Sequence, residues 1–232
     1  MTSCTALHSH HNRAGHQLGP VDQPKSLKQA AYESLHQAIL SGLLVQEKIY
    51  TERELATTLS ISRTPVREAL LELAAKELVV LVPRKGIKVK TFQRNDWEEI
   101  FELRQALEVA AVEKITGTVA SQDIQAMEAI IDQQRTCQAQ NDGDGFLYQD
   151  RLLHGLLCEL TANKRLIKSY TDLLDLIQVM GIYPLHEPGR MQEVIEEHLA
   201  VVHGIRSNDP ALSRKAIKYH LTITQRKGLN FC

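Results

Sequence analysis

The sequence predicts a mostly α-helical protein in two parts: a small N-terminal domain that ends in one β-hairpin, and a C-terminal antiparallel bundle of about six or seven helices. Three observations predict this fold. Two short helical patterns lie within residues 51–71, two β-rich runs flank a Pro/Gly turn at 83–86, and the periodicity is helical throughout from Asn95 onward. A chain of 232 residues has room for two domains of about 100–150 residues each.

Residues 1–24 show no hydrophobic period, so we expect a disordered tail. Its four histidines leave a metal-binding tract as the alternative. The tail lacks the apolar core of a signal peptide, and no run in the chain approaches the roughly 18 apolar residues of a membrane helix. The four cysteines form no CxxC pair, which suits a reducing compartment. We therefore expect a cytoplasmic protein without membrane contact.

Three helices are predicted to open the N-terminal domain, each with its own start signal. Ser26 is a favoured N-cap for the first helix. Thr51 and Glu54 form the S/T-x-x-E pattern of a capping box at the start of the second. Ser62 or Thr64 is expected to cap the third helix.

A β-hairpin is predicted after the third helix, because β-rich runs at residues 79–82 and 87–90 surround a Pro-Arg-Lys-Gly turn. Three helices followed by a hairpin is the order of a winged helix-turn-helix domain, which we place at residues 25–92. The third helix of such a domain lies in the DNA major groove and reads base edges from its N-terminal residues. The sequence therefore predicts specific binding to double-stranded DNA.

The start of the third helix carries side chains suited to that contact. Arg63 and Arg67 lie four residues apart on one helical face, and a forked guanidinium can bond to guanine or to phosphate. The Ser62 and Thr64 hydroxyls could bond to phosphate, and Arg53 in the preceding helix is placed to hold the DNA backbone. The alternative for any single arginine is a solvated surface residue.

The hairpin tip and the charge distribution also indicate DNA binding. Arg84, Lys85 and Gly86 would form a wing that reaches phosphate or the minor groove. Residues 25–94 hold 12 Lys and Arg against 7 Asp and Glu, whereas residues 95–232 hold 14 against 20. A basic segment before an acidic remainder is typical of a nucleic-acid module joined to another module, although chance variation in solvated faces is the alternative.

The C-terminal part carries one carboxylate and three imidazoles beside apolar helical stripes. Asp150 and His154 are four residues apart, so they share one face of a helix, and His198 and His220 lie on two later helices. These side chains could converge in a bundle core, where metal sites recur. Spacing alone leaves the alternative of a surface pair and two half-buried histidines.

The segment TERELATTLSISRTPVREALLELAAKELV, from Thr51 to Val79, resembles the DNA-binding domain of GntR-type bacterial regulators. The resemblance extends over about residues 27–92. Val45-Gln46 stands where the family usually has Pro-Gly, which changes a turn but no contact residue. The resemblance implies that the DNA-contacting residues are Arg53, Ser62, Arg63, Thr64, Arg67 and Gly86.

Residues 95–225 resemble the all-helical effector domain of the FadR subgroup, through FELRQALEVAA, the D-x-x-x-H segment and a final histidine on the last helix. The resemblance implies an effector and dimerisation domain at residues 95–228 that holds a divalent metal. Zinc is favoured, and nickel, manganese or iron are compatible with these ligand types. The implied ligands are Asp150, His154, His198 and His220.

The resemblance also implies that the effector is a small organic acid bound with the help of an arginine on the first bundle helix. By position this arginine is Arg104, whose guanidinium fork matches a carboxylate. The alternative role for Arg104 is an i,i+4 ion pair with Glu108. His36, His186 and His203 match no ligand and stay unassigned.

Together these features predict a homodimeric, ligand-responsive transcriptional regulator that reads a palindromic operator. Repression is the commoner role in the family, so we expect a repressor. No additional nucleophile or general base is visible beside the four ligands, so we expect no enzyme activity. The alternatives are a metal-dependent enzyme and a regulator whose metal only stiffens the bundle.

Overall fold

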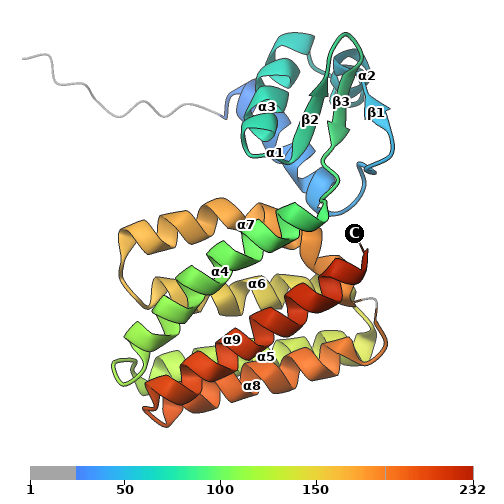
Figure 1. Cartoon of the computed structure of the whole chain (residues 1–232). Helices are drawn as coiled ribbons and strands as arrows, with labels where there is room; N and C mark the ends of the chain where they lie inside the picture. The colour runs from blue at the N-terminus through green and yellow to red at the C-terminus, as the bar shows by residue number, and fades with distance from the viewer. Residues whose placement is uncertain (1–24, 186, 232) are drawn as a thin grey trace, which may run out of the picture.

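The computed structural model describes residues 25–185 and 187–231. The predicted tail and His186 lie outside the described residues. Three helices followed by a hairpin confirm the predicted winged helix-turn-helix (Figure 1). The N-terminal elements are α1 (Leu27–Leu40), β1 (Ile49–Tyr50), α2 (Glu52–Thr58), α3 (Arg63–Ala75), β2 (Val79–Val82) and β3 (Gly86–Val89).

Side-chain caps fix the starts of α1 and α2. The hydroxyls of Ser26 and Thr51 each accept a hydrogen bond from the backbone N–H three residues later, at 3.1 and 3.0 Å. Ser62 occupies the N-cap position of α3, but its hydroxyl makes no capping bond, and Thr64 lies inside the helix. The prediction of a side-chain cap on α3 is therefore wrong. The third helical position is Pro65, which has no N–H to donate.

The wing is an antiparallel sheet of three strands in the order β1-β3-β2. The sequence did not reveal β1, because two residues are too few to show an alternating pattern. Gly86 has a φ of +135°, and a Cβ added there would lie 2.1 Å from the Tyr50 carbonyl oxygen. The close approach of β1 and β3 therefore requires glycine at this position.

The C-terminal bundle has six helices in the part of the chain that the structure describes: α4 (Arg94–Ile115), α5 (Ser121–Gln140), α6 (Gly143–Glu159), α7 (Lys164–Leu185), α8 (Arg190–Arg206) and α9 (Pro210–Gly228), followed by η1 (Leu229–Phe231). This confirms the predicted bundle. The helix α7 continues to Leu185. Pro184 lies in its last turn, where its missing N–H removes one helical hydrogen bond.

Among the described residues, no helix is both long and apolar enough to cross a membrane.

Close helix crossings hold the last two helices together. A Cβ added to Gly204 on α8 would lie 2.6 Å from the backbone nitrogen of Ser213 on α9, so only glycine allows this approach. The Ser213 hydroxyl is buried and lies 2.9 Å from the Thr116 hydroxyl at the end of α4. The crossing fixes α9, which carries His220, against α8, which carries His198.

The N-terminal domain meets the bundle where α1 approaches α7 (Figure 1). Leu176 and Val179 of α7 pack against the hydrophobic core of the N-terminal domain. His36 on α1 places its Nε2 atom 2.8 Å from an Asp175 carboxylate oxygen on α7. Apolar packing and a polar contact therefore join the two parts.

Candidate nucleic-acid interface and candidate metal centre

A cleft of about 580 Å³ lies between the wing and helices α2 and α3. The structure thus brings basic side chains from three separate segments to one face. Ser62 and Thr64 are exposed at the start of α3, on either side of Arg63. The other six residues predicted to contact DNA line the cleft: Arg53, Arg63, Arg67, Arg84, Lys85 and Gly86.

The charges of this cleft are exposed and mostly unpaired. Within the described residues, Arg53 and Arg63 make no ion pair. Arg67 is 70% exposed, and its Nε atom lies 3.8 Å from a Glu52 carboxylate oxygen. Such an exposed, loose pair contributes little free energy, so the guanidinium stays available to an incoming phosphate or base.

Arg84 holds an unusual backbone conformation at the tip of the wing. It is the third residue of the turn closed by the Lys85 N–H and the Val82 carbonyl oxygen at 3.0 Å, and its φ is +63°. This turn position favours glycine, and a side chain there costs on the order of 1 kcal/mol. The presence of an arginine in this unfavourable conformation supports a functional role for its exposed guanidinium.

The second candidate site lies inside the bundle. Asp150 and His154 come from α6, His198 from α8 and His220 from α9. One ligand-capable atom of each lies within 4.8 Å of those of the others, the three histidines are buried, and Asp150 is half-buried. The four residues proposed from the sequence therefore converge, and the alternative of a surface pair does not describe Asp150 and His154.

Each of the three histidines has its Nδ1 atom beside a side-chain oxygen. His154 Nδ1 contacts Glu108, His198 Nδ1 lies 2.9 Å from Gln134 Oε1, and His220 Nδ1 lies 2.7 Å from Glu197 Oε2. Because each oxygen accepts, Nδ1 carries the proton and Nε2 keeps its lone pair. The Nε2 atoms of His154 and His198 are buried, and no described residue bonds to them.

Two buried arginines hold the two glutamates. Arg104 Nε donates to Glu108 at 2.7 Å, and Arg190 donates to both Glu197 oxygens at 2.6 and 2.9 Å. Burial raises the pKa of Glu108, but the charge of Arg104 and the hydrogen bonds from Arg104 and His154 outweigh burial and lower it to about 2. Burial also opposes ionisation of Glu197, yet its hydrogen bonds lower its pKa. Both glutamates are therefore ionised acceptors.

His198 and His220 are held in the form that binds metal. Burial lowers the pKa of His198 well below its ordinary value, and the neighbouring histidines lower it further. Burial also lowers the pKa of His220, against the opposing effect of the Glu197 hydrogen bond. Neutral imidazoles with free Nε2 lone pairs are metal ligands.

Arg104 lies beside this cluster, and the structure contains the alternative ion pair with Glu108. Only its Nε atom takes part in that pair. Its Nη2 atom is buried and has no hydrogen-bond partner among the described residues. Arg104, Asp150 and His220 border a cavity of about 20 Å³. Arg104 can therefore keep Glu108 and still donate to a small ligand.

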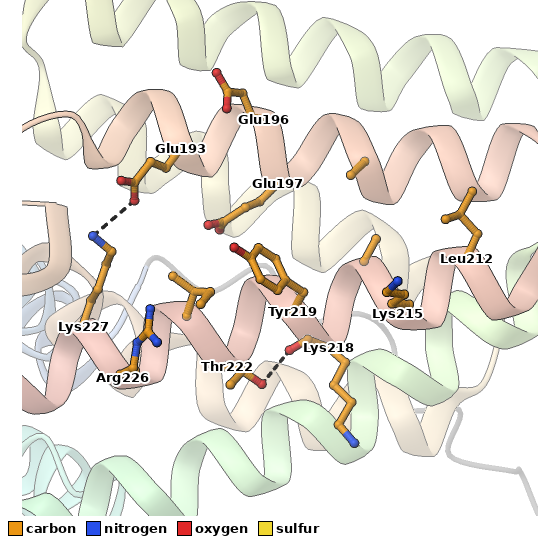
Figure 2. A pocket seen from close by; sticks show the side chains of 13 residues that line it. Glu193, Glu196, Glu197, Leu212, Lys215, Lys218, Tyr219, Thr222, Arg226 and Lys227 are labelled. Carbon is orange, nitrogen blue, oxygen red and sulfur yellow. Dashed lines mark hydrogen bonds and ion pairs between the residues drawn. The ribbon is translucent and has the colours of Figure 1, made fainter.

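A larger groove, of about 850 Å³, runs outside the bundle between α8 and α9 (Figure 2). Figure 2 shows Glu193 and Glu196 on its α8 side and Lys218 and Lys227 on its α9 side. Glu193 and Lys227 form an ion pair at 3.2 Å. None of the four clustered Asp and His side chains lines this groove. Its size alone does not make it the candidate site.

Sequence reasoning missed the side chains that support the histidines. Glu108 and Glu197 look like ordinary glutamates of amphipathic helices, and Glu197 follows the exposed Glu196 directly. The spacing of Glu108 from Arg104 is the one available signal, and it predicts an ion pair only. Nothing local marks Gln134 as the partner of His198, since 64 residues separate them.

Comparison with known families covers both parts of the chain. The model of the bacterial regulatory proteins of the gntR family matches residues 27–89, and the FCD domain model matches residues 99–222, which is more than half of the chain. The chain belongs to the GntR family. The predicted assignment to this family, with a FadR-type C-terminal domain, is therefore confirmed.

Relatives of this GntR regulator are transcription factors. It is 22% identical over 200 residues to the gluconate operon transcriptional repressor of Bacillus licheniformis, which covers 83% of this chain and 81% of that one. It is 25% identical over 210 residues to the HTH-type transcriptional repressor RspR of Escherichia coli K12, which covers 88% and 89%. The structure of E. coli McbR/YncC has the same fold, with a TM-score of 0.72, 21% identity and coverage of 86% and 95%.

These findings identify a DNA-binding transcriptional regulator. Regulators of the GntR family are not enzymes, which confirms the prediction of no enzyme activity. The bundle of this regulator also holds a His/Asp group that could bind a metal ion.

Proposed function

We propose that this GntR regulator is a homodimeric, cytoplasmic repressor whose affinity for a palindromic operator is set by a small organic acid bound at a metal in the FCD bundle. In this proposal residues 25–92 bind DNA, and residues 95–228 bind the metal and the effector and form the dimer. The observation that supports this proposal most directly is the cluster of one half-buried aspartate and three buried histidines. Beside it, the buried Nη2 atom of Arg104 has no hydrogen-bond partner among the described residues.

In the proposed DNA complex, the start of α3 enters the major groove. Arg63 and Arg67 bond to base edges or phosphate, and Arg53 fixes the backbone. The exposure of these side chains and the absence of ion pairs at Arg53 and Arg63 in the described chain support this role. Ser62, Thr64, Lys85 and Gly86 contact phosphate, and Arg84 reaches from the wing tip. A two-fold dimer presents two such surfaces to two half-sites.

Asp150, His154, His198 and His220 are the proposed metal ligands. Two observations support these ligands: the contacts that hold the Nδ1 atoms, and the Nε2 atoms of His154 and His198, which make no hydrogen bond and lie 3.8 and 3.4 Å from Asp150. Hydrogen bonds from the other ring nitrogen orient metal-binding histidines. Zinc is the favoured ion, and nickel, manganese and iron suit the same ligands. When bound, the ion supplies open coordination positions to which a carboxylate can bind. Arg104 would donate to the same carboxylate through its Nη2 atom.

A chain of polar contacts supports coupling between this site and the DNA-binding domain. Arg151 follows the ligand Asp150 on α6, and its Nη1 atom lies 2.6 Å from Gln178 Oε1 and 3.8 Å from Asp175 on α7. Asp175 in turn lies 2.8 Å from His36 on α1. We propose that effector binding shifts α6 and α7 and so changes how α1 is held. The change in DNA affinity equals the difference in effector affinity between the two arrangements.

Asp175→Asn tests this coupling, because the amide keeps the shape of the side chain but removes the charge that attracts His36 and Arg151. We expect metal content to stay the same, while the effector-dependent change in DNA affinity shrinks by about 1 kcal/mol or more. Asp172→Asn, an exposed residue of the same helix, is the matched control. An unchanged effector response in the Asp175 variant would rule out this route.

Elemental analysis of bound metal tests the proposed function itself. Protein that begins at Lys25 avoids binding by the histidines of the first 24 residues. We expect about one metal ion per chain, and none in the His154→Ala/His198→Ala variant. His203→Gln, which changes an exposed histidine on α8, should keep the ion. Absence of metal from all three proteins would refute the metal-dependent part of the proposal.

A further inference from the structure

The groove of about 850 Å³ between α8 and α9 takes no part in the proposed function. Its lining extends along α9 from Leu212 to Lys227, which is about four turns of helix. On α8 it includes Glu193, Glu196 and Ala200, whose spacing puts them on one helical face. A surface of this length on two straight helices suits a protein partner.

The two sides of the groove carry opposite charges. The α8 side presents Glu193 and Glu196, and the α9 side presents Lys215, Lys218, Arg226 and Lys227 (Figure 2). Lys227 forms ion pairs with Glu193 and Glu187. The other three cations make no ion pair in the described part of the chain, and Glu196 accepts a hydrogen bond only from its neighbour Gln192. Charges on both sides are therefore free to meet a partner.

An exposed aromatic side chain lies at the centre of this surface. Tyr219 on α9 is 59% exposed, and Figure 2 shows it between the acidic side chains of α8 and the basic side chains of α9. The small side chains of Ala200 and Ala216 also line the groove. Tyrosine is enriched at the centres of protein interfaces, where a ring of polar contacts surrounds it. The groove has that arrangement.

The charge pattern selects the kind of partner. A nucleic acid would meet the cations of α9 but would be repelled by the acids of α8. A uniformly acidic protein surface would be repelled in the same way. The matching partner carries an acidic edge and a basic edge side by side. A second copy of this groove has both.

Two-fold symmetry makes the groove complementary to itself. An axis parallel to α8 and α9 places the basic α9 side of each copy over the acidic α8 side of the other. Glu196 of one copy then faces the edge that carries Lys218 and Arg226 in the other. The two Tyr219 side chains approach each other at the axis. A two-fold axis across the helices would instead place like charges together.

The composition of the groove also indicates how strong this contact is. Seven of its thirteen lining residues are charged, whereas the buried centres of permanent interfaces are depleted of charge. The contact is therefore reversible and sensitive to salt. Such a contact suits the association of two dimers better than the permanent dimer.

We infer that two copies of the regulator dock through their α8–α9 grooves about a two-fold axis parallel to these helices, and that this contact joins two dimers into a tetramer. The inference goes beyond the proposed function and depends on neither the metal nor the effector. A tetramer has four DNA-binding domains, so it can hold two operators at once.

Sedimentation velocity of the full-length wild-type protein gives the first test. We expect dimers at low protein concentration and tetramers at high micromolar concentration in low salt. High salt should return the protein to dimers, because it screens contacts between exposed charges. Since no substitution is needed, this measurement does not depend on the folding of a variant.

Charge reversal tests the contact itself. Glu196→Lys makes both sides of the groove basic, and Lys218→Glu/Arg226→Glu makes both sides acidic. Each variant should remain dimeric, with a tetramer dissociation constant at least about tenfold higher than that of the wild type. An equal mixture of the two variants should form tetramers again, because each basic side then faces an acidic one. Restored association also shows that both variants are folded.

Tyr219→Ala tests the centre of the contact and should weaken the tetramer about tenfold. Tyr148→Ala, which removes a tyrosine on α6 that is 54% exposed, is the matched control and should leave the tetramer unchanged. All variants should keep the wild-type metal content and operator affinity of the isolated dimer.

A wild-type protein that stays dimeric at every concentration would overturn the inference, and so would a mixture of variants that does not associate. Monomeric charge variants would show that the groove forms the dimer itself and does not join dimers. In each of these cases the proposed function stands. A wild-type protein that is monomeric would contradict the dimer of the proposed function as well.

Discussion

The DNA-binding cleft and the metal cluster hold their arginines in opposite ways. Arg63 and Arg67 are exposed, and neither has a tight ion pair within the described chain. Arg104 and Arg190 are buried, and each is bonded to a buried glutamate. Exposed charges cost little and attract a polyanion over a distance of about a Debye length. Buried charges are costly, but their partners hold them in place, so they can select one small ligand.

This difference means that substitutions in the two regions should have separable effects. A change in the cleft should alter DNA binding and leave stability and metal binding intact. A change in the cluster should alter metal binding and stability first, and DNA binding only through the effector.

The largest expected effect is on DNA affinity in Arg63→Ala/Arg67→Ala. Each arginine that contacts a base is worth about 1–3 kcal/mol, so the double variant should lose about 2–6 kcal/mol of binding free energy. Fluorescence anisotropy with an operator selected from random DNA measures this loss. Arg135→Ala, an exposed arginine on α5, serves as the control. Wild-type affinity in the double variant would remove these residues from the interface.

The next largest effect is metal-dependent stability. Zinc at about a hundred times its dissociation constant should raise the free energy of unfolding by about 2.7 kcal/mol in the wild-type protein. His154→Ala/His198→Ala should lose this increment, whereas His203→Gln should keep it. Denaturant unfolding with and without zinc gives both values. Equal stabilisation of the double variant would place the ion elsewhere.

The pH dependence of the metal-free protein tests the buried histidines. The pKa values of His198 and His220 are lowered from 6.5 in the folded chain, so below pH 6.5 the unfolded chain binds more protons. Stability should therefore be fully present above pH 6.5 and fall as the pH decreases, by up to about 1.4 kcal/mol per pH unit for each histidine.

The measurement compares, between variants, how steeply the free energy of unfolding falls as the pH decreases. His198→Gln should flatten the decline below pH 6.5, since one group that takes up a proton only on unfolding has been removed. His203→Gln, on the exposed face of the same helix, should decline like the wild-type protein. The same slope in the His198 variant would show that this histidine is not held neutral by burial.

The smallest effect is expected at the wing tip. Arg84→Gly removes the guanidinium but suits the positive φ of this residue, so stability should change by less than about 1 kcal/mol. DNA affinity should fall, and the slope of its salt dependence should decrease by about one phosphate contact. Unchanged salt dependence would show that Arg84 makes no phosphate contact.

The two regions also differ in how far the sequence revealed them. The helix-turn-helix was predictable because its signals are local: caps at Ser26 and Thr51, an apolar stripe, and a Pro/Gly turn within one continuous segment. The strand β1 was not, because its two residues become a strand only through pairing with β3. One of the two N–H groups to which a side-chain cap of α3 could bond is missing, because the third helical residue is Pro65.

The metal cluster needed the fold. Its candidate ligands could be named by resemblance, but their convergence depends on the packing of α6, α8 and α9. The partners of the Nδ1 atoms were not predictable, because no local sequence feature distinguishes Glu108, Gln134 and Glu197 from surface residues. Arg190 was not predictable either, because only the structure shows that it is buried and that it lines the cavity.

The central claim is that an acid bound at the buried cluster controls the exposed DNA-binding cleft. The most direct test measures the operator affinity of Zn²⁺-loaded wild-type protein in the presence of each member of a panel of small organic acids. At least one acid should change the affinity by about fivefold or more, and none should do so with His154→Ala/His198→Ala. If no acid in the panel changes the affinity of the wild-type protein, the claim is contradicted.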